Sequence, residues 1–353
     1  AAMIDADYTG SAKERNKNLQ TQFALEYNIP YVKGLKVKGT FIYDYNNYGY
    51  KATRKGFKTY TYGEYTGEYT AADANYPALL QDNRRESERV DMQFQTNYNR
   101  TFGNHTIGAT YVFERREEKA NWMNGERKFD FFTIGELDNA RESDQKVSGS
   151  SEHQAYLSHI GRLTYDYKGK YLLSATMRAD GSSKYQEKWG YFPSVGAAWN
   201  ISEEGFMKDQ KWVDYLKLRA SWGKLGNDKV AASDGFASIT QDMGTSGIFG
   251  GSAVPGYTNL VYFSWLGWEV VNETNVGLDF RTLNSRLTIE ADWYYRLTQN
   301  AVIDAPLPMG AGNLLGNRGE ILNTGVELSF NWADKIGKDF SYYIGAKLDN
   351  LAQ

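Results

Sequence analysis

The sequence contains no cysteine and only three histidines among its 353 residues, so few of the usual metal ligands are available. A chain without cysteine forms no disulfide, which fits an oxidising compartment and the cytosol equally well. His153 and His159 fall on one face of a predicted strand, but six residues of strand separate them by about 20 Å, too far to share a metal ion. His105 lies apart from both, and no Gly-x-Ser-x-Gly or His-Glu-x-x-His motif occurs. We therefore expect no enzymatic activity, no metal and no cofactor.

Long hydrophobic runs are also absent, since no stretch approaches the about 20 apolar residues of a membrane-spanning helix. The formal net charge of -3 gives no reason to expect a nucleic-acid partner. No repeat with the period of a propeller blade is visible. These absences leave a membrane β-barrel open, because half of each barrel strand faces an aqueous lumen and lowers the hydropathy of the whole chain.

The most informative stretch is residues 286–298, in which apolar and polar side chains alternate strictly. Successive side chains of a strand point to opposite faces, so this pattern predicts one apolar face and one polar face. The apolar set is Leu287, Ile289, Ala291, Trp293, Tyr295 and Leu297, and the polar set is Thr288, Glu290, Asp292, Tyr294, Arg296 and Thr298. A basic residue at mid-depth on a lipid-facing surface costs about 2–4 kcal/mol, which explains why charges keep to one face.

The same alternation recurs along the chain and predicts about 12 strands. They cover residues 19–29, 35–45, 88–100, 105–116, 152–167, 170–181, 189–200, 214–226, 268–282, 286–300, 318–332 and 339–351. The aromatic share of 15%, with 27 tyrosines, suits the aromatic girdles of a bilayer interface. A soluble sandwich would have shorter strands and more frequent turns. The predicted fold is therefore all-β, a transmembrane antiparallel up-and-down β-barrel.

Short and long connections alternate between these strands, as in bacterial barrels with short periplasmic turns and long outer loops. Short connections are expected near residues 30–34, 101–104, 168–169, 201–213, 283–285 and 333–338. Long ones are expected at 46–87, 117–151, 227–267 and 301–317, with a shorter one near 182–188. Residues 202–207 are expected to hold one helical turn capped by Ser202. Trp199, Trp212 and Trp332 are expected near the short turns, as girdle or turn packing.

Four stretches resemble signatures of the SusC/RagA family of TonB-dependent outer-membrane proteins of Bacteroidota. They are Met177-Arg-Ala-Asp-Gly-Ser-Ser-Lys-Tyr185, Gly190-Tyr-Phe-Pro-Ser-Val-Gly-Ala-Ala-Trp199, Leu216-Lys-Leu-Arg-Ala-Ser-Trp-Gly-Lys-Leu-Gly-Asn227 and Asn317-Arg-Gly-Glu-Ile-Leu-Asn-Thr-Gly-Val-Glu327. Their order and spacing match as well, and the similarity runs through most of residues 20–350.

This resemblance implies a 22-stranded barrel filled by an N-terminal plug that carries a TonB box. We expect residues 1–353 to be a barrel portion only, without plug or TonB box. Twelve strands alone would leave two unpaired edges in lipid, where each unsatisfied backbone group costs several kcal/mol. Either further strands complete the barrel, which we favour, or the 12 close into a narrower one.

The polar strand faces give candidate residues for a lumen wall or a plug-facing surface. They are Arg178, Lys217, Arg219, Asp279, Arg281, Glu290, Asp292, Arg296, Asn323 and Glu327. Asp180 and the residues after it are expected to form a rim turn with a structural role. Ligand contacts are assigned to aromatic residues in or beside the long loops, because flat rings stack on sugar faces and cover peptide side chains. These candidates are Trp122, Tyr257, Tyr262 and Trp265, with packing between loops as the alternative role.

The expected function is TonB-dependent import of oligosaccharides or peptides across the outer membrane of a bacterium. The resemblance implies a SusD-like surface lipoprotein as a lid and TonB–ExbB–ExbD as the energy source, acting through the plug. Outer-membrane lipid would surround the barrel. Two alternatives stay open: a SusC-like barrel that serves as a structural subunit of an outer-membrane assembly or secretion complex, and a small closed barrel with enzymatic activity.

Overall fold

A computed structural model describes residues 5–132, 134–143, 145–230, 240–258, 266–306 and 313–352. The chain divides into two compact units. Unit 1 comprises residues 1–23, 41–91 and 116–154, and unit 2 comprises residues 24–40, 92–115 and 155–353. Each unit is described separately below. No helix in the described ranges is long and apolar enough to cross a membrane.

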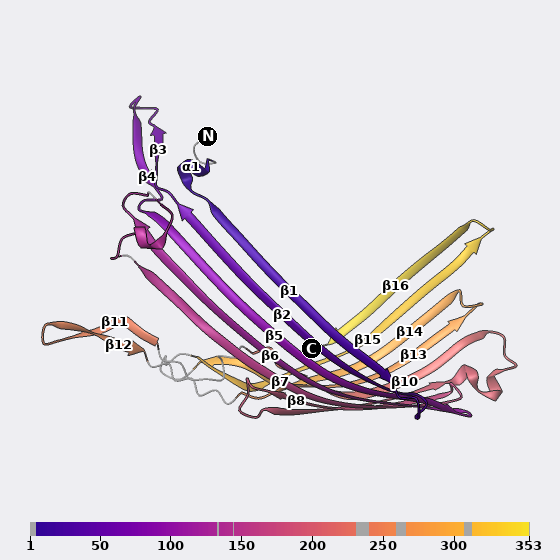
Figure 1. The fold of residues 1–353 in the computed structure, drawn as a ribbon. Coiled ribbons are helices and arrows are strands. Elements are labelled where there is room, and N and C mark those ends of the chain that lie inside the picture. Colours follow the sequence, from indigo (N-terminus) through magenta and orange to yellow (C-terminus); the bar gives the residue numbers. More distant parts are fainter. Residues whose placement is uncertain are drawn as a thin grey trace. The chain divides into compact units, whose positions relative to one another are not determined.

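Twelve strands form the main sheet, and their order in the sheet follows their order in the chain. They are β1 (Ala12–Asn28), β2 (Leu35–Arg54), β5 (Ala78–Phe102), β6 (His105–Phe129), β7 (Lys146–Tyr167), β8 (Tyr171–Ser182), β9 (Trp189–Asn200), β10 (Val213–Asn227), β13 (Glu269–Thr282), β14 (Leu287–Pro306), β15 (Asn313–Ile336) and β16 (Phe340–Ala352). All 12 predicted strands are therefore confirmed, and the strand pairs of unit 2 are antiparallel. Figure 1 shows β13 to β16 side by side, coloured from orange to yellow.

The antiparallel register of unit 2 places apolar and polar side chains on opposite faces of the sheet. In one row across β10, β13, β14, β15 and β16, Leu218 lies opposite Leu278, which is followed by Ala291, Leu328 and Leu348. This apolar face is uncovered in the described structure, since Leu278 is 38% exposed and Leu348 63%. Apolar side chains that gain no burial from the protein itself need an apolar environment around it, as a lipid-facing surface has.

Several strands are longer than the periodicity predicted. Strand β5 begins at Ala78 instead of residue 88, and β6 continues to Phe129 instead of residue 116. Two hairpins within the long connections were not predicted, β3 (Phe57–Tyr62) with β4 (Tyr69–Ala74) and β11 (Thr240–Phe249) with β12 (Ser252–Thr258). The short helix α1 (Ala6–Thr9) was also missed. These extensions pair through the backbone while their side chains no longer alternate between apolar and polar, so the pattern that predicts strands fails there.

The short connections lie where they were predicted, but the expected helical turn is wrong in detail. The structure has two 3₁₀ turns, η3 (Ile201–Glu203) and η4 (Gly205–Met207), and neither has a side-chain cap. The chain begins to turn at Ile201, so Ser202 lies inside the first turn and not before it, and its hydroxyl is buried without a hydrogen-bond partner.

Glu204, between η3 and η4, instead ties this connection to the strand ends. Its carboxylate accepts hydrogen bonds from Tyr171 Oη at 2.6 Å, Lys170 Nζ at 2.9 Å and Trp199 Nε1 at 3.1 Å. The rings of Tyr171 and Trp199 stack with their centroids 6.5 Å apart. Trp212 packs beside Phe280, and Trp332 donates to Tyr342 Oη at 3.3 Å. Aromatic packing at the short-turn end is thus confirmed for all three tryptophans.

Unit 1 contains a small core beneath the connection between β6 and β7. Leu80 and Phe129 are almost fully buried, and Phe132, Leu137 and Ala140 pack against them. The guanidinium of Arg127 donates to three backbone carbonyls of this connection, those of Leu137 at 2.8 Å, Ala140 at 3.1 Å and Arg141 at 3.1 Å. The connection is therefore held in one conformation by a side chain of the strand that precedes it.

Candidate functional site

The polar face of unit 2 brings most of the predicted wall residues into two neighbouring rows. One row contains Lys217, Asp279, Glu290, Ser329 and Lys347, and the next contains Arg219, Gly277, Asp292, Glu327 and Asp349. Directly opposed side chains lie about 4.5–5.5 Å apart at Cβ, within reach of one another. The rows therefore carry charges of both signs, with carboxylates side by side at Asp279 and Glu290 and at Asp292, Glu327 and Asp349.

Arg219 is the centre of this wall. Its Nη2 lies 2.6 Å from Asp292 Oδ2, its Nε lies 3.1 Å from Asp279 Oδ1, and Nη1 donates to Asn275 at 3.4 Å. The guanidinium lies over Gly277, where a Cβ would come within 2.4 Å of Arg219 Cζ and 2.6 Å of Asp292 Oδ1. Only a residue without a side chain lets one arginine join β10 to β13 and β14 in this way.

Further along the same face, Arg296 Nε lies 3.0 Å from Glu273 Oε2, and Arg296 is paired in register with Asn323. Asn323 Oδ1 and Asp292 Oδ1 are buried and accept no hydrogen bond within the described ranges. Such acceptors are costly unless a donor from elsewhere reaches them.

The remaining wall candidates have their own partners in unit 2. Arg178 Nε lies 2.5 Å from Asp180 Oδ2, two residues along β8. Arg281 lies over the ring of Tyr215, with Cζ 5.2 Å from the centroid. A hollow of about 480 Å³ opens over β7 to β10 and is lined by Arg162, Lys217, Arg219 and several small side chains, among them Ser174 and Ser221.

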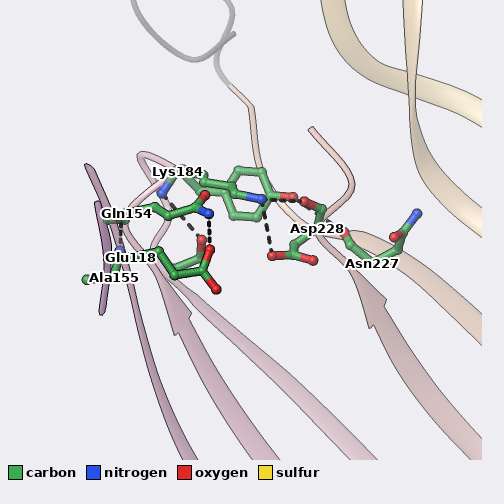
Figure 2. A network of polar contacts seen from close by, with 9 residues as sticks. Glu118, Gln154, Ala155, Lys184, Asn227 and Asp228 are labelled. Atoms are coloured by element: carbon green, nitrogen blue, oxygen red, sulfur yellow. Dashed lines mark hydrogen bonds and ion pairs between the residues drawn. The ribbon is translucent and has the colours of Figure 1, made fainter. Parts of the chain in front are cut away.

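The Asp180–Tyr185 motif is buried and hydrogen-bonded, which agrees with the expected structural role, but Asp180 and Ser182 lie at the end of strand β8 and not in a turn. Asp180, Ser182 and Tyr185 are buried, and Ser183 exchanges two hydrogen bonds with Ala155, accepting at its hydroxyl and donating from its backbone N–H. Figure 2 shows Lys184 reaching toward Asp228, whose carbonyl oxygen lies 3.1 Å and whose carboxylate lies 3.5 Å from Nζ. Lys184 is only 11% exposed at its side chain.

Tyr185, in the connection between β8 and β9, adds further contacts to this motif. It packs against Trp268 with ring centroids 5.2 Å apart and donates to the Asn227 carbonyl at 3.4 Å. Burial, together with the nearby charges of Asp228 and Glu269, raises the pKa of the Tyr185 phenol, so it stays a donor. The connection between β8 and β9 is therefore fastened to the ends of β10 and β13.

The predicted loop aromatics are only partly described. Trp122 does not lie in a loop: it belongs to the extended part of β6 and is 42% exposed. The assignment to a loop was wrong because apolar alternation ends before the strand does. Tyr257 lies in β12, where only its backbone is described. Tyr262 and Trp265 lie outside the described residues.

A set of exposed aromatic side chains in unit 1 was missed. Tyr60, Tyr62 and Tyr69 lie on one face of the β3–β4 hairpin, Tyr65 lies at its tip, and all four are exposed. The rings of Tyr62 and Tyr69 are 5.1 Å apart. The signal was present in the sequence Thr59-Tyr-Thr-Tyr-Gly-Glu-Tyr, which alternates threonine with tyrosine without an apolar partner set.

Each histidine has a local partner, and none lies beside another. His105 Nδ1 is 2.7 Å from Tyr165 Oη, His159 Nδ1 is 2.9 Å from Tyr111 Oη, and His153 Nε2 is 2.9 Å from Glu117 Oε1. Among the described residues, no three acidic, histidine or cysteine side chains gather as metal ligands.

Comparison with known proteins also indicates a membrane β-barrel. The sequence matches the family described as TonB dependent receptor-like, beta-barrel, over residues 4–352. It is 33% identical over 283 residues to the TonB-dependent receptor P39 of Formosa agariphila, which covers 74% of this chain and 26% of that protein. It is 34% identical over 195 residues to the TonB-dependent receptor SusC of Bacteroides thetaiotaomicron, covering 53% of this chain and 19% of that protein.

The fold is similar to one chain in a structure of the RagAB peptide transporter. The TM-score is 0.79 at 21% sequence identity, and the match covers 96% of this chain and 37% of that chain. The 353 residues therefore span about a quarter of the first curated relative and little more than a third of this structural neighbour.

Proposed function

Because the chain belongs to the TonB dependent receptor-like β-barrel family, we propose that it forms part of the wall of a receptor that imports oligosaccharides or peptides. Members of this family are outer-membrane receptors and not enzymes, in agreement with the expected absence of catalytic activity. The family assignment also confirms the SusC/RagA resemblance and the outer-membrane location.

One observation carries the import proposal beyond the family assignment. The face opposite the exposed apolar rows bears mixed charges in register, with Arg219 between Asp279 and Asp292. A selectivity ring for a small ion would carry one sign of charge, and the mixed signs on this face do not form such a ring. We therefore propose hydrogen-bonding solutes, oligosaccharides or peptides, as the cargo.

The partners follow from the relatives as proposals for the full-length protein. RagAB is a peptide transporter by name, and we propose that a SusD-like surface lipoprotein is a partner of the full-length protein here. We further propose that residues 1–353 are wall only, and that TonB–ExbB–ExbD acts through a plug encoded elsewhere in the same polypeptide.

Uptake by cells that carry the full-length gene tests the proposal. Labelled oligosaccharides and peptides should enter wild-type cells, and uptake should fall to background when either this gene or the gene for TonB is deleted. Restoring the full-length gene should restore uptake only in cells that have TonB. Uptake that persists without TonB would overturn energy coupling. Unchanged uptake with defective outer-membrane assembly in the gene deletion would instead establish the scaffold role.

A further inference from the structure

The first strand of the main sheet carries three basic side chains on one face. Lys13, Arg15 and Lys17 are separated by single residues in β1 (indigo in Figure 1), so all three project to the same side of the sheet. All three are exposed, and none of their side chains forms an ion pair or a hydrogen bond in the part of the chain that the structure describes. We call these three residues the basic stripe. It runs along about 14 Å of strand without a counter-charge of its own.

Further along β1 the same face is apolar. Leu19 follows Lys17 by two residues and is 55% exposed, and Phe23 on the same face is 67% exposed. Large apolar side chains that the protein leaves uncovered fit the lipid-facing surface of a barrel. The basic stripe therefore begins where the lipid-facing part of the strand ends.

Strand geometry sets the distance of the basic stripe from the hydrocarbon. At about 3.4 Å per residue and a tilt of about 45°, Lys17 lies about 5 Å, Arg15 about 10 Å and Lys13 about 14 Å beyond the level of Leu19. The headgroup layer on each side of a bilayer is about 5–8 Å thick. Lysine and arginine have long aliphatic stems that can bend toward this layer and place the charged head in it. All three cationic groups are therefore within reach of lipid headgroups.

The neighbouring strand adds no acidic group beside the basic stripe. A backbone hydrogen bond of 2.8 Å from Thr53 to Ser11 fixes the register of β2 against the start of β1. Residues 45–54 of β2, which this register places beside the stripe, contain no aspartate and no glutamate. Glu136 reaches β2 from the connection after β6, and there it pairs with Lys51 at 2.8 Å. The charge of the stripe is therefore left for a group outside the described chain.

Charge and position together narrow the class of that group. Ammonium and guanidinium groups bind phosphate oxygens through charge-assisted hydrogen bonds. Along the border between hydrocarbon and water the available phosphates are those of lipid headgroups, and each basic residue near an anionic membrane surface adds to the attraction. The acidic Glu86 belongs to β5, two strand spacings or about 10 Å from β1, so salt screens much of its repulsion there.

We infer that Lys13, Arg15 and Lys17 bind the phosphate-bearing headgroup of a membrane lipid. The lipid belongs to the leaflet at the end of the strands that carries the long connections, which is the outer leaflet in the expected topology. The inference uses the outer-membrane location that follows from the family, and it does not use the import proposal. Either of the two can therefore fail without the other.

Lipid binding by the purified full-length protein in detergent tests this inference. The protein is titrated with monophosphoryl lipid A and with the same lipid after enzymatic removal of its phosphate, and bound lipid is measured by native mass spectrometry. Wild type should prefer the phosphorylated lipid. Lys13→Gln, Arg15→Gln and Lys17→Gln together should weaken its binding up to about a hundredfold, because each basic residue contributes about fivefold. Binding of the dephosphorylated lipid should not change.

A variant of unchanged composition separates the position of the charges from their number. Arg15→Asn with Asn16→Arg, combined with Lys17→Asn and Asn18→Lys, moves two charges to the opposite face of β1. It should lose most of the preference for phosphate, whereas Lys58→Gln, at an exposed lysine of β3, should keep it. Thermal unfolding of each variant in detergent shows that it is folded.

Equal binding of the two lipids by the wild type would overturn the inference, because a stripe that faces a protein or only water has no reason to distinguish them. A preference that survives in the triple glutamine variant, or in the variant with exchanged residues, would place the phosphate elsewhere and would also overturn it. TonB-dependent uptake decides the import proposal separately.

Discussion

Placing a single arginine on either face of β10 gives the sharpest test of the wall. Ala220 and Ser221 are adjacent, small and exposed, but Ala220 belongs to the apolar face and Ser221 to the polar face. On the apolar face, the charged residues that bound the band are Asp214, six residues before Ala220, and Lys224, four residues after it. At about 3.4 Å per residue and a tilt of about 45°, these intervals rise about 14 Å and about 10 Å. Ala220 therefore lies near the middle of an apolar band about 25 Å tall.

Ala220→Arg should destabilise the protein by about 2–4 kcal/mol, because a guanidinium at the bilayer midplane loses its hydration. Ser221→Arg points into the polar side, beside Asn275 in register, and should change stability by about 0.5 kcal/mol or less. The difference corresponds to about a 10-fold to 1000-fold change in the folding equilibrium. Denaturant titration of the full-length protein in lipid vesicles measures it. Equal tolerance of the two arginines, or a larger loss at Ser221, would refute the assignment of faces.

Three further changes test the parts that fasten the strands. Hydrogen bonds from Tyr171, Lys170 and Trp199 lower the pKa of Glu204 to about 2. Glu204→Gln should therefore remove a contribution to the free energy of unfolding that is complete above pH 4.5 and disappears as pH falls toward 2. Unfolding midpoints of both proteins across that range should converge at the acid end, and a constant difference would contradict the pairing. Gly226→Ala should cost about 1–3 kcal/mol, because its Cβ would lie 2.1 Å from the ring of Phe192, which is buried against Trp268. The control Gly161→Ala meets nothing within 4 Å and should be neutral. Thermal unfolding measures both variants. Arg127→Lys keeps the charge, but a lysine cannot donate to three carbonyls at once, so limited proteolysis should cut residues 130–145 several times faster. An unchanged cleavage rate would show that the buried Phe129 and Leu80 hold this connection without Arg127.

The strands of unit 2 could be predicted because lipid and water impose opposite demands on adjacent residues. Residues 286–298 alternate as strictly in the structure as in the sequence, with Trp293 and Asp292 on opposite faces. A structural role for the residues around Asp180 was predicted from their turn chemistry, and the burial of Asp180, Ser182 and Tyr185 agrees with that role. For the same reason Lys217, Asp279 and Glu290 share one face of the sheet, as the alternation predicts, and their role in a lumen wall stays a prediction. Their partners were not predictable, because the pairing of Arg219 with Asp279 and Asp292 depends on strand register over 60 and 73 residues of separation.

The extended strands and their hairpins escaped prediction because no lipid acts on them. Beyond residue 116, β6 continues as Glu117, Glu118 and Lys119, with charges on both faces and no period to detect. What holds such a segment is backbone pairing and local contacts, here the Arg127 carbonyl contacts and the core around Leu80. Trp122 was misplaced for the same reason, and the tyrosines of the β3–β4 hairpin were overlooked.

The charges of the unit 2 wall are largely bound within the wall itself. Arg219, Arg296 and Arg178 each contact a carboxylate of the same face. A wall whose charges are already paired offers a passing solute little binding energy, and transport requires contacts weak enough to release the cargo. Substitutions around Arg219 should therefore change stability before they change uptake.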